Sequence, residues 1–273
     1  MTLRFEDILM VGCGNMAGAM LEGWLAGGLE PGRFTVVEPS DKALPDGIVR
    51  YRTLPESGEF DAVLLGVKPQ MLDNVAADVA RLTGANTTVL SLLAGVELAT
   101  LAARFPQAAA HVRVMPNLAV ALGKAPIAFA GNGLDEAGRA GLMALMDPLG
   151  TPEWVGEDEF DLVTALAGSG PAFVYRFIDA LAGGAAALGL SRAQADRLSL
   201  AMVEGAAALA AASNESPGKL ADRVASPGGM TRKGLDVLDR DQALVALLTE
   251  TLRATRDRGA ELAAEARKPF DKG

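Results

Sequence analysis

The chain has 273 residues, half of them hydrophobic and 22% charged, with a formal net charge of −9. This composition is typical of a globular protein large enough for two domains, and it excludes a disordered chain. The acidic balance argues against a nucleic-acid or anionic-membrane partner, because both attract basic surfaces.

The first half of the chain alternates short apolar runs with helical stretches. The runs expected to be buried strands are Ile8–Val11, Phe34–Val37, Ala62–Val67, Thr88–Leu93, Val112–Met115 and Ile127–Ala130. The helices expected beside them are Met16–Ala26, Met71–Leu82 and Leu134–Met146. Since parallel strands need crossover connections, this alternation predicts a parallel sheet with helices on both faces, in an α/β domain over residues 1–153.

The pattern changes after about Thr151. From Phe160 onward we expect no strand, only helices rich in Ala and Leu, at Glu157–Leu166, Pro171–Leu188, Arg192–Ala212, Gly218–Val224, Met230–Arg240 and Gln242–Ala266. The sequence therefore predicts an all-α domain over residues 154–273. Small residues at 182–187 and 205–208 allow close helix packing, which fits a bundle within one chain or a helical dimer interface. The sequence leaves both open.

A glycine motif follows the first expected strand and opens a helix. Its residues, Gly12, Cys13, Gly14, Asn15, Met16 and Ala17, form a G-x-G-x-x-A pattern. The first glycine permits a tight turn, the second lets a pyrophosphate approach the backbone, and the small Ala17 allows helix and strand to pack closely. With the strand before it and the helix after it, the motif predicts a Rossmann-type dinucleotide site.

Glu38 ends the second expected strand and is the candidate ligand for the adenosine ribose. A carboxylate there accepts from both ribose hydroxyls of NADH and repels the 2′-phosphate of NADPH. Arg33, Lys42 and the hydroxyl of Ser40 lie nearby in the sequence and could offset that repulsion. We expect NADPH or NADH as cofactor, with a slight preference for NADH, and a solvated surface acid is the alternative for Glu38.

Two more loops follow expected strands, where ligands of open α/β sheets bind. The first is Gly66-Val67-Lys68-Pro69, and the second contains Ala94 and Gly95. Small residues in both leave room for the nicotinamide ribose. Lys68 is either a ligand of a phosphate or ribose oxygen, or an ordinary surface lysine.

The chain resembles the pyrroline-5-carboxylate reductase family along essentially its whole length. The motifs that carry the resemblance are Gly14-Asn15-Met16-Ala17-Gly18, Val67-Lys68-Pro69, Arg113-Val114-Met115-Pro116-Asn117, Ala167-Gly168-Ser169-Gly170-Pro171-Ala172, and Ser226-Pro227-Gly228-Gly229-Met230-Thr231 followed by Gly234-Leu235-Asp236-Val237-Leu238. The resemblance implies a Rossmann domain, a helical domain that forms a homodimer, often within larger rings, and reduction of 1-pyrroline-5-carboxylate to L-proline in proline biosynthesis. Within these motifs we count Asn117 among the cofactor residues.

The motif at 226–231 is the candidate substrate site. Two glycines before a helix expose backbone amides, which suit a carboxylate. We expect Ser226, Gly228, Gly229, Met230 and Thr231 to bind substrate, and the resemblance implies that the Thr231 hydroxyl contacts the ring nitrogen during catalysis. Without the resemblance, the same residues fit a plain turn and a back-bonding threonine.

Two departures from the family pattern stand out. Leu118-Ala119 replaces a Thr-Pro that often follows Met-Pro-Asn, and Met230 replaces a residue that is often Thr or Ala. The first puts the shape of the loop after Asn117 in doubt, and the second puts little in doubt.

Other residue types narrow the chemistry. His111 is the only histidine and is expected to be structural or surface-exposed, and one His with one Cys predicts no metal site. No lysine occurs between Lys124 and Lys219, which disfavours alcohol oxidation, where a base is needed. Imine reduction has no such requirement.

The sequence also bears on compartment and on competing functions. A single cysteine, and Glu6 and Asp7 directly before the first apolar run, lead us to expect a cytoplasmic protein. The alternatives to the reductase are another imine or carbonyl reductase with the same two domains, or a non-catalytic dinucleotide-binding protein.

Overall fold

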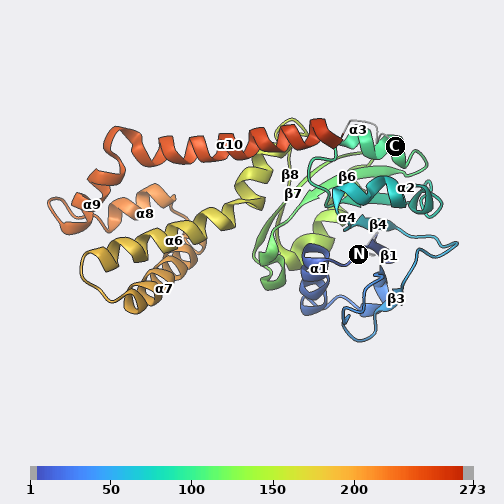
Figure 1. Ribbon diagram of the computed structural model, residues 1–273, viewed down its shortest axis with the longest axis horizontal. Helices are drawn as coiled ribbons and strands as arrows, with labels where there is room; N and C mark the ends of the chain where they lie inside the picture. The colour runs from blue at the N-terminus through green and yellow to red at the C-terminus, as the bar shows by residue number, and fades with distance from the viewer. Residues whose placement is uncertain (1–4, 267–273) are drawn as a thin grey trace. The chain divides into compact units, whose positions relative to one another are not determined.

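A computed structural model describes residues 5–266, and these form two compact units (Figure 1). The first unit contains the residues up to Ser169 together with those from Thr255 on, and the second is Gly170–Ala254. This division does not follow the expected domain boundary at 153/154, because the segment after β8 and the end of the last helix pack with the sheet. The boundary at 153/154 stays a prediction.

The first unit is built on one sheet of eight strands. They are β1 (Ile8–Val11), β2 (Phe34–Val37), β3 (Val49–Tyr51), β4 (Ala62–Leu65), β5 (Thr88–Ser91), β6 (Ala110–Met115), β7 (Ala125–Asn132) and β8 (Gly150–Trp154), in the spatial order β3-β2-β1-β4-β5-β6-β7-β8. The first six strands in sequence are mutually parallel, which gives the dinucleotide-binding order 3-2-1-4-5-6. The sheet was expected to be parallel, but β7 pairs with β6 antiparallel and β8 follows β7.

Helices cover both faces of the sheet (Figure 1). On one face lie α1 (Asn15–Ala26) and α4 (Glu136–Met146), and on the other α2 (Leu72–Ala80) and α3 (Leu98–Arg104). All residues of β1, β4 and β5 are buried, as continuous apolar strands between two helical layers should be. Trp24 of α1 stacks on Phe34, and its indole Nε1 donates to the carbonyl of Leu145 in α4.

Short segments complete the first unit. They are the 3₁₀ turns η1 (Pro31–Arg33), η2 (Pro69–Met71), η3 (Leu118–Leu122) and η4 (Asp147–Leu149), the helix α5 (Phe160–Val163), and a π-helical turn, η5 (Thr164–Gly168). The helix expected at Glu157–Leu166 is thus α5 continued by a π turn. β3, α3 and β8 have no counterpart among the expected elements.

The second unit is entirely helical. It contains α6 (Gly170–Ala187), α7 (Arg192–Ala211), α8 (Pro217–Arg223), α9 (Met230–Leu238), η6 (Arg240–Gln242) and the beginning of α10 (Ala243–Ala266), which ends in the first unit. Ser191 caps α7, its side chain accepting from the amide of Gln194. Among residues 5–266, no helix is both long and apolar enough to cross a membrane.

The second unit buries almost no side chain by itself. The structure describes every residue of this unit, and those it buries are Ala182, Ala195, Ser199 and Ala225. Large apolar side chains are instead exposed along α6, α7 and α10, among them Tyr175, Phe177, Leu198, Leu209 and Leu247. A helical unit without a core of its own needs a second surface to cover these residues.

Candidate cofactor and substrate sites

The glycine motif forms the turn between β1 and α1 at the carboxyl edge of the sheet. Gly12 has a φ of +88°, which only glycine adopts readily. A methyl group at Gly66, the residue after β4, would lie 2.6 Å from the Gly12 carbonyl oxygen and 2.8 Å from Ala17 Cβ. The loop after β4 is therefore packed directly against the glycine turn.

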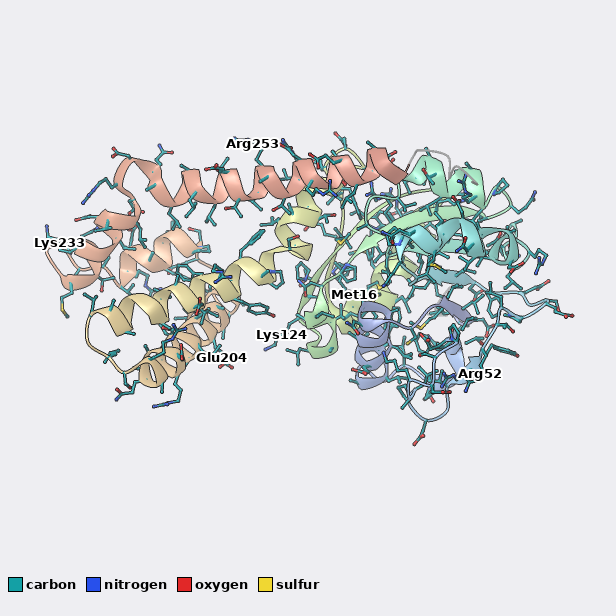
Figure 2. All side chains as sticks on the ribbon, in the orientation of Figure 1. Met16, Arg52, Lys124, Glu204, Lys233 and Arg253 are labelled. Carbon is teal, nitrogen blue, oxygen red and sulfur yellow. The ribbon has the colours of Figure 1, made fainter. Side chains whose placement is uncertain are left out.

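The start of α1 is open for an anion. A methyl group at Gly14 would have no atom within 4 Å, and Gly14 caps α1 without any side-chain hydrogen bond to the first-turn amides. Asn15 is exposed and Met16, labelled in Figure 2, is half-buried in this first turn. An uncapped helix start with space above it fits the pyrophosphate of a dinucleotide.

Glu38 is fixed beside this turn. Its Oε2 accepts from the amide of Cys13 at 3.1 Å, and its Oε1 accepts from the amide of Ser40 at 3.0 Å. Burial raises the pKa of Glu38, but the hydrogen bonds from Ser40 and Cys13 and the charge of Arg50 outweigh it, so the pKa is lowered. Glu38 is therefore ionised at neutral pH and held by two backbone amides, and its role as a ribose ligand stays a prediction.

Two arginines around strand β3, which the sequence analysis missed, hold the loop after Glu38. Arg50 donates to the carbonyls of Lys42 and Glu38, at 2.9 and 3.2 Å. Arg52, labelled in Figure 2, donates to the carbonyl of Pro39 and pairs with Asp41. Arg-x-Arg with a period of two, on an edge strand near the candidate ribose ligand Glu38, is the signal that could have identified them.

Of the cations expected to offset Glu38, one lies at the turn and one does not. Lys42 Nζ donates to the Cys13 carbonyl at 3.0 Å and lies close to Gly18. Arg33, which directly precedes β2, instead forms an ion pair with Glu6 at 2.6 Å. Arg50 thus supplies the nearby charge that Arg33 was expected to supply.

Cys13 contributes its backbone to the turn. Its side chain is buried, and burial raises the pKa of its thiol, with Lys42 opposing the rise and Glu38 adding to it. The thiol is therefore neutral, while the amide orients Glu38.

The other two predicted cofactor loops lie at the same edge of the sheet. Lys68 is exposed at the start of η2, beside the half-buried Val67 and Pro69. After β5, the amide of Val96 donates to the carbonyl of Leu93, which closes a turn in which Gly95 has a φ of +74°. That φ requires glycine at the third position of the turn.

The side chain of Asn117 is engaged inside the protein. It is buried, its Nδ2 donates to the carbonyl of Ala167 in η5 at 2.9 Å, and its Oδ1 accepts from the amide of Ala119 at 2.9 Å. Proline at position 119 could not make the second bond, because it has no N–H. The departure at Leu118-Ala119 thus ties Asn117 to its own loop, and its role in cofactor binding stays a prediction.

The predicted substrate residues form one turn and one helix start in the second unit. The Gly229 amide donates to the Ser226 carbonyl at 2.9 Å, and Gly228 has a φ of +74°, with Pro227 before it. These are the features of a type II turn. It leads into α9, whose cap Gly229 makes no side-chain hydrogen bond to the first turn, and Met230 and Thr231 are exposed there.

Arg232, the next residue of α9, forms ion pairs with carboxylates that lie before and after the turn. Its guanidinium donates to Asp236 at 2.9 Å, to Asp239 at 3.0 Å and to Asp222 in α8 at 3.5 Å. The hydrogen bond that Arg232 donates to Asp236 raises the pKa of Arg232. The guanidinium of Arg232 is therefore bound by carboxylates. An anion at this turn would be bound by the backbone amides instead.

The remaining candidates are structural. His111 is buried in β6, and its Nε2 lies 3.0 Å from the carbonyl oxygen of Phe105. Within residues 5–266, no group of three or more His, Cys, Asp or Glu side chains is placed to hold a metal ion.

The six parallel strands, the uncapped glycine turn and the ionised carboxylate at the end of β2 define a dinucleotide-dependent oxidoreductase. A family model described as pyrroline-5-carboxylate reductase dimerisation matches residues 157–262. Relatives named pyrroline-5-carboxylate reductase include one from Synechocystis, 38% identical over 78% of this chain and 80% of its own, and one from Escherichia coli, 31% identical over 94% and 98%. The chain belongs to the pyrroline-5-carboxylate reductase family.

Solved structures agree. A pyrroline-5-carboxylate reductase from Coxiella burnetii, 28% identical, covers 95% of this chain and 99% of its own with a TM-score of 0.85. The fold is also that of a Plasmodium falciparum pyrroline carboxylate reductase solved with NADP bound, at 20% identity, a TM-score of 0.79 and coverage of 96% and 100%. The predicted fold class, a Rossmann-type domain followed by a helical dimerisation domain, is confirmed.

Proposed function

We propose that this chain reduces the C=N bond of 1-pyrroline-5-carboxylate to give L-proline, with NADPH or NADH as the hydride donor. The observation that carries the proposal is family membership over nearly the whole chain, together with an intact glycine turn for each ligand. The reaction belongs to proline biosynthesis, and we place it in the cytoplasm, because a single cysteine gives no sign of an oxidising compartment.

The first unit binds and orients the cofactor. The close approach of Gly66 to Gly12 and Ala17, and the open space at Gly14, fit a dinucleotide whose pyrophosphate rests on the amides of α1. Glu38 accepts from the ribose hydroxyls, because each of its oxygens keeps a lone pair beyond the amide it already binds. When bound, the nicotinamide supplies the hydride.

The second unit seats the substrate carboxylate. The turn at Ser226–Gly229 leads into the uncapped amides of α9, which attract an anion through hydrogen bonds and the helix dipole. The hydroxyl of Thr231, in the first turn of the same helix, donates to or accepts from the ring nitrogen as its charge changes. An iminium arrives protonated, so the step needs no general acid, and positioning supplies most of the acceleration.

The enzyme is a homo-oligomer, a dimer or a multiple of dimers. The family model over residues 157–262 describes dimerisation, and the helical unit exposes apolar side chains that a second copy covers. Of the two readings left open by the sequence, the dimer interface is the one supported.

The direct test is oxidation of NADPH and NADH with pyrroline-5-carboxylate, alongside a cyclic imine that lacks a carboxylate. Turnover only with the carboxylated ring supports the proposal. Equal turnover of both imines favours a general imine reductase, and cofactor binding without any turnover favours a non-catalytic dinucleotide-binding protein.

A variant pair tests the role of Thr231. We expect Thr231→Ala to lower kcat about tenfold to a hundredfold, because an aligned hydrogen bond in the transition state is lost, with cofactor affinity nearly unchanged. Thr231→Ser keeps the hydroxyl and should retain most of the activity. Full turnover in Thr231→Ala would remove Thr231 from the mechanism.

A further inference from the structure

We propose that Glu157 is a positioning residue for the cofactor, because its carboxylate holds the Ala94-Gly95 turn in place from a distant part of the chain. The inference rests on the proposed function and on the sequence prediction that this turn leaves room for the nicotinamide ribose. Its basis lies entirely within the first unit, in the contacts of four segments: the loop after β5, strand β6, the turn before α5, and the end of α10.

The first observation is a helix cap that comes from elsewhere in the sequence. Helix α3 follows the Ala94-Gly95 turn at once, and its own cap residue, Glu97, makes no side-chain hydrogen bond to the helix start. Glu157 Oε1 instead accepts from the amide of Leu98 at 2.7 Å, across 59 residues of sequence. The first amide of α3 is therefore satisfied by Glu157, in the turn before α5, and not by the loop that precedes α3.

The second observation is the cation that holds Glu157. Arg113 of β6 has a side chain that is only 5% exposed, its Nη1 lies 3.6 Å from Glu157 Oε1, and its Nη2 lies 3.5 Å from Asp161. Its guanidinium also lies over the ring of Phe160, 4.1 Å from the centroid. A buried cation requires such partners, so the carboxyl group of Glu157 is drawn to one position.

The third observation is that the turn is confined on a second side. A methyl group at Gly95 would lie 3.2 Å from the amide nitrogen of Ala263 and 3.2 Å from the carbonyl carbon of Leu262, both in α10. Helix α10 thus packs against Gly95 of this turn, and Glu157 binds the amide of Leu98 just after the turn. With both in place, the turn is set before the cofactor arrives, which reduces the ordering cost of binding.

Three substitutions at Glu157 separate the effect of side-chain length from the effect of charge. Glu157→Gln keeps an oxygen that accepts from Leu98 and removes the charge, Glu157→Asp keeps the charge and shortens the side chain, and Glu157→Ala removes both. The matched control is Glu159→Ala, because Glu159 Oε2 accepts from the amide of Gly156 at 3.1 Å within the same turn before α5.

The measurement is the Kd of NADH and of NADPH by calorimetry on the intact oligomer, which needs no turnover. We expect Glu157→Ala and Glu157→Asp to raise the Kd about fivefold, as for a lost hydrogen bond. Glu157→Gln and Glu159→Ala should stay within about twofold of the original. In steady state, the KM for the cofactor should rise in parallel while kcat and the KM for pyrroline-5-carboxylate hold.

Hydrogen exchange at the Leu98 amide gives a second reading. In the original protein this amide should be protected, and in Glu157→Asp it should exchange faster while the amides of β5 do not change. An unchanged Kd in Glu157→Asp and Glu157→Ala overturns the proposal, as does an equal rise in Glu159→Ala. If no imine is reduced at all, the proposed function fails, and the binding comparison still decides the role of Glu157.

Discussion

Replacing Glu38 by serine should shift the cofactor preference toward NADPH. The structure shows a carboxylate that two backbone amides hold beside the glycine turn and that remains ionised at neutral pH. In the proposed site, this carboxylate accepts from the ribose hydroxyls of NADH. With NADPH, it faces the 2′-phosphate, a group with nearly two negative charges above pH 7.

Two contributions set the size of the effect. Charges about 4 Å apart interact by roughly 1 kcal/mol in water and about 4 kcal/mol at a protein surface, and nearby Lys42 and Arg50 offset part of the repulsion. A hydrogen bond to a charged acceptor contributes about 1.5–3 kcal/mol. Allowing for screening, we expect a total near 3 kcal/mol, or about a hundredfold in the ratio of kcat/KM for NADPH to that for NADH.

The assay is NADPH and NADH oxidation at pH 8 with saturating pyrroline-5-carboxylate. Asp41→Asn is the matched control, since it removes a carboxylate from the same loop, one that is 89% exposed and paired with Arg52. It should change the ratio by less than about twofold, because exposed pairs contribute little. A ratio that stays constant in Glu38→Ser would refute the assignment of Glu38 as the selector.

The other expectations concern stability, measured at fixed protein concentration because the enzyme is an oligomer. Gly66→Ala places a methyl group against Gly12, so it should lower the free energy of unfolding by about 1–3 kcal/mol and weaken cofactor binding. Gly84→Ala is the control and should do neither, because a methyl group at Gly84 would have no atom within 4 Å. Asn117→Ala leaves one buried and one half-buried backbone group without their partner and should lower the free energy of unfolding by about 1–3 kcal/mol in a urea titration; an unchanged midpoint would contradict these contacts. Gln242→Gly, at a φ of 56°, should raise the melting temperature, and a fall would show that this backbone is not strained.

Much of the fold could be predicted because its strongest signals are local. β1 and β2 have the expected bounds, and α4 and α7 differ from expectation by a residue or two at their ends. β3 was missed because Val49–Tyr51 is a half-exposed edge strand of three residues without an apolar run. β8 was missed because it contains Pro152, which edge strands tolerate but central strands exclude.

The direction of β7 could not be read from the sequence. Its apolar run, Ile127–Ala130, is the same whether the strand runs parallel or antiparallel to β6. The deciding feature is the connection through η3, which is too short to hold a crossover helix. A turn this short has little hydrophobic periodicity, and so a wholly parallel sheet was expected from the sequence.

The candidate site also contains residues that the sequence predicts and contacts that it does not. The glycines could be predicted because Gly12, Gly95 and Gly228 occupy conformations that other residues avoid. The contact between Glu157 and Leu98 joins residues far apart in sequence. No spacing rule predicts such pairs, because only the fold brings them together.

Helix α10 starts in the second unit and ends in the first, with Leu262 and Ala263 against Gly95. The helical unit is therefore an insertion within the sheet unit, and not an appendage to it. Cutting the gene at residue 169 would yield a sheet fragment whose Gly95 turn has lost the backbone that covers it. Work on the isolated cofactor domain would need residues 255–266 grafted back onto the fragment.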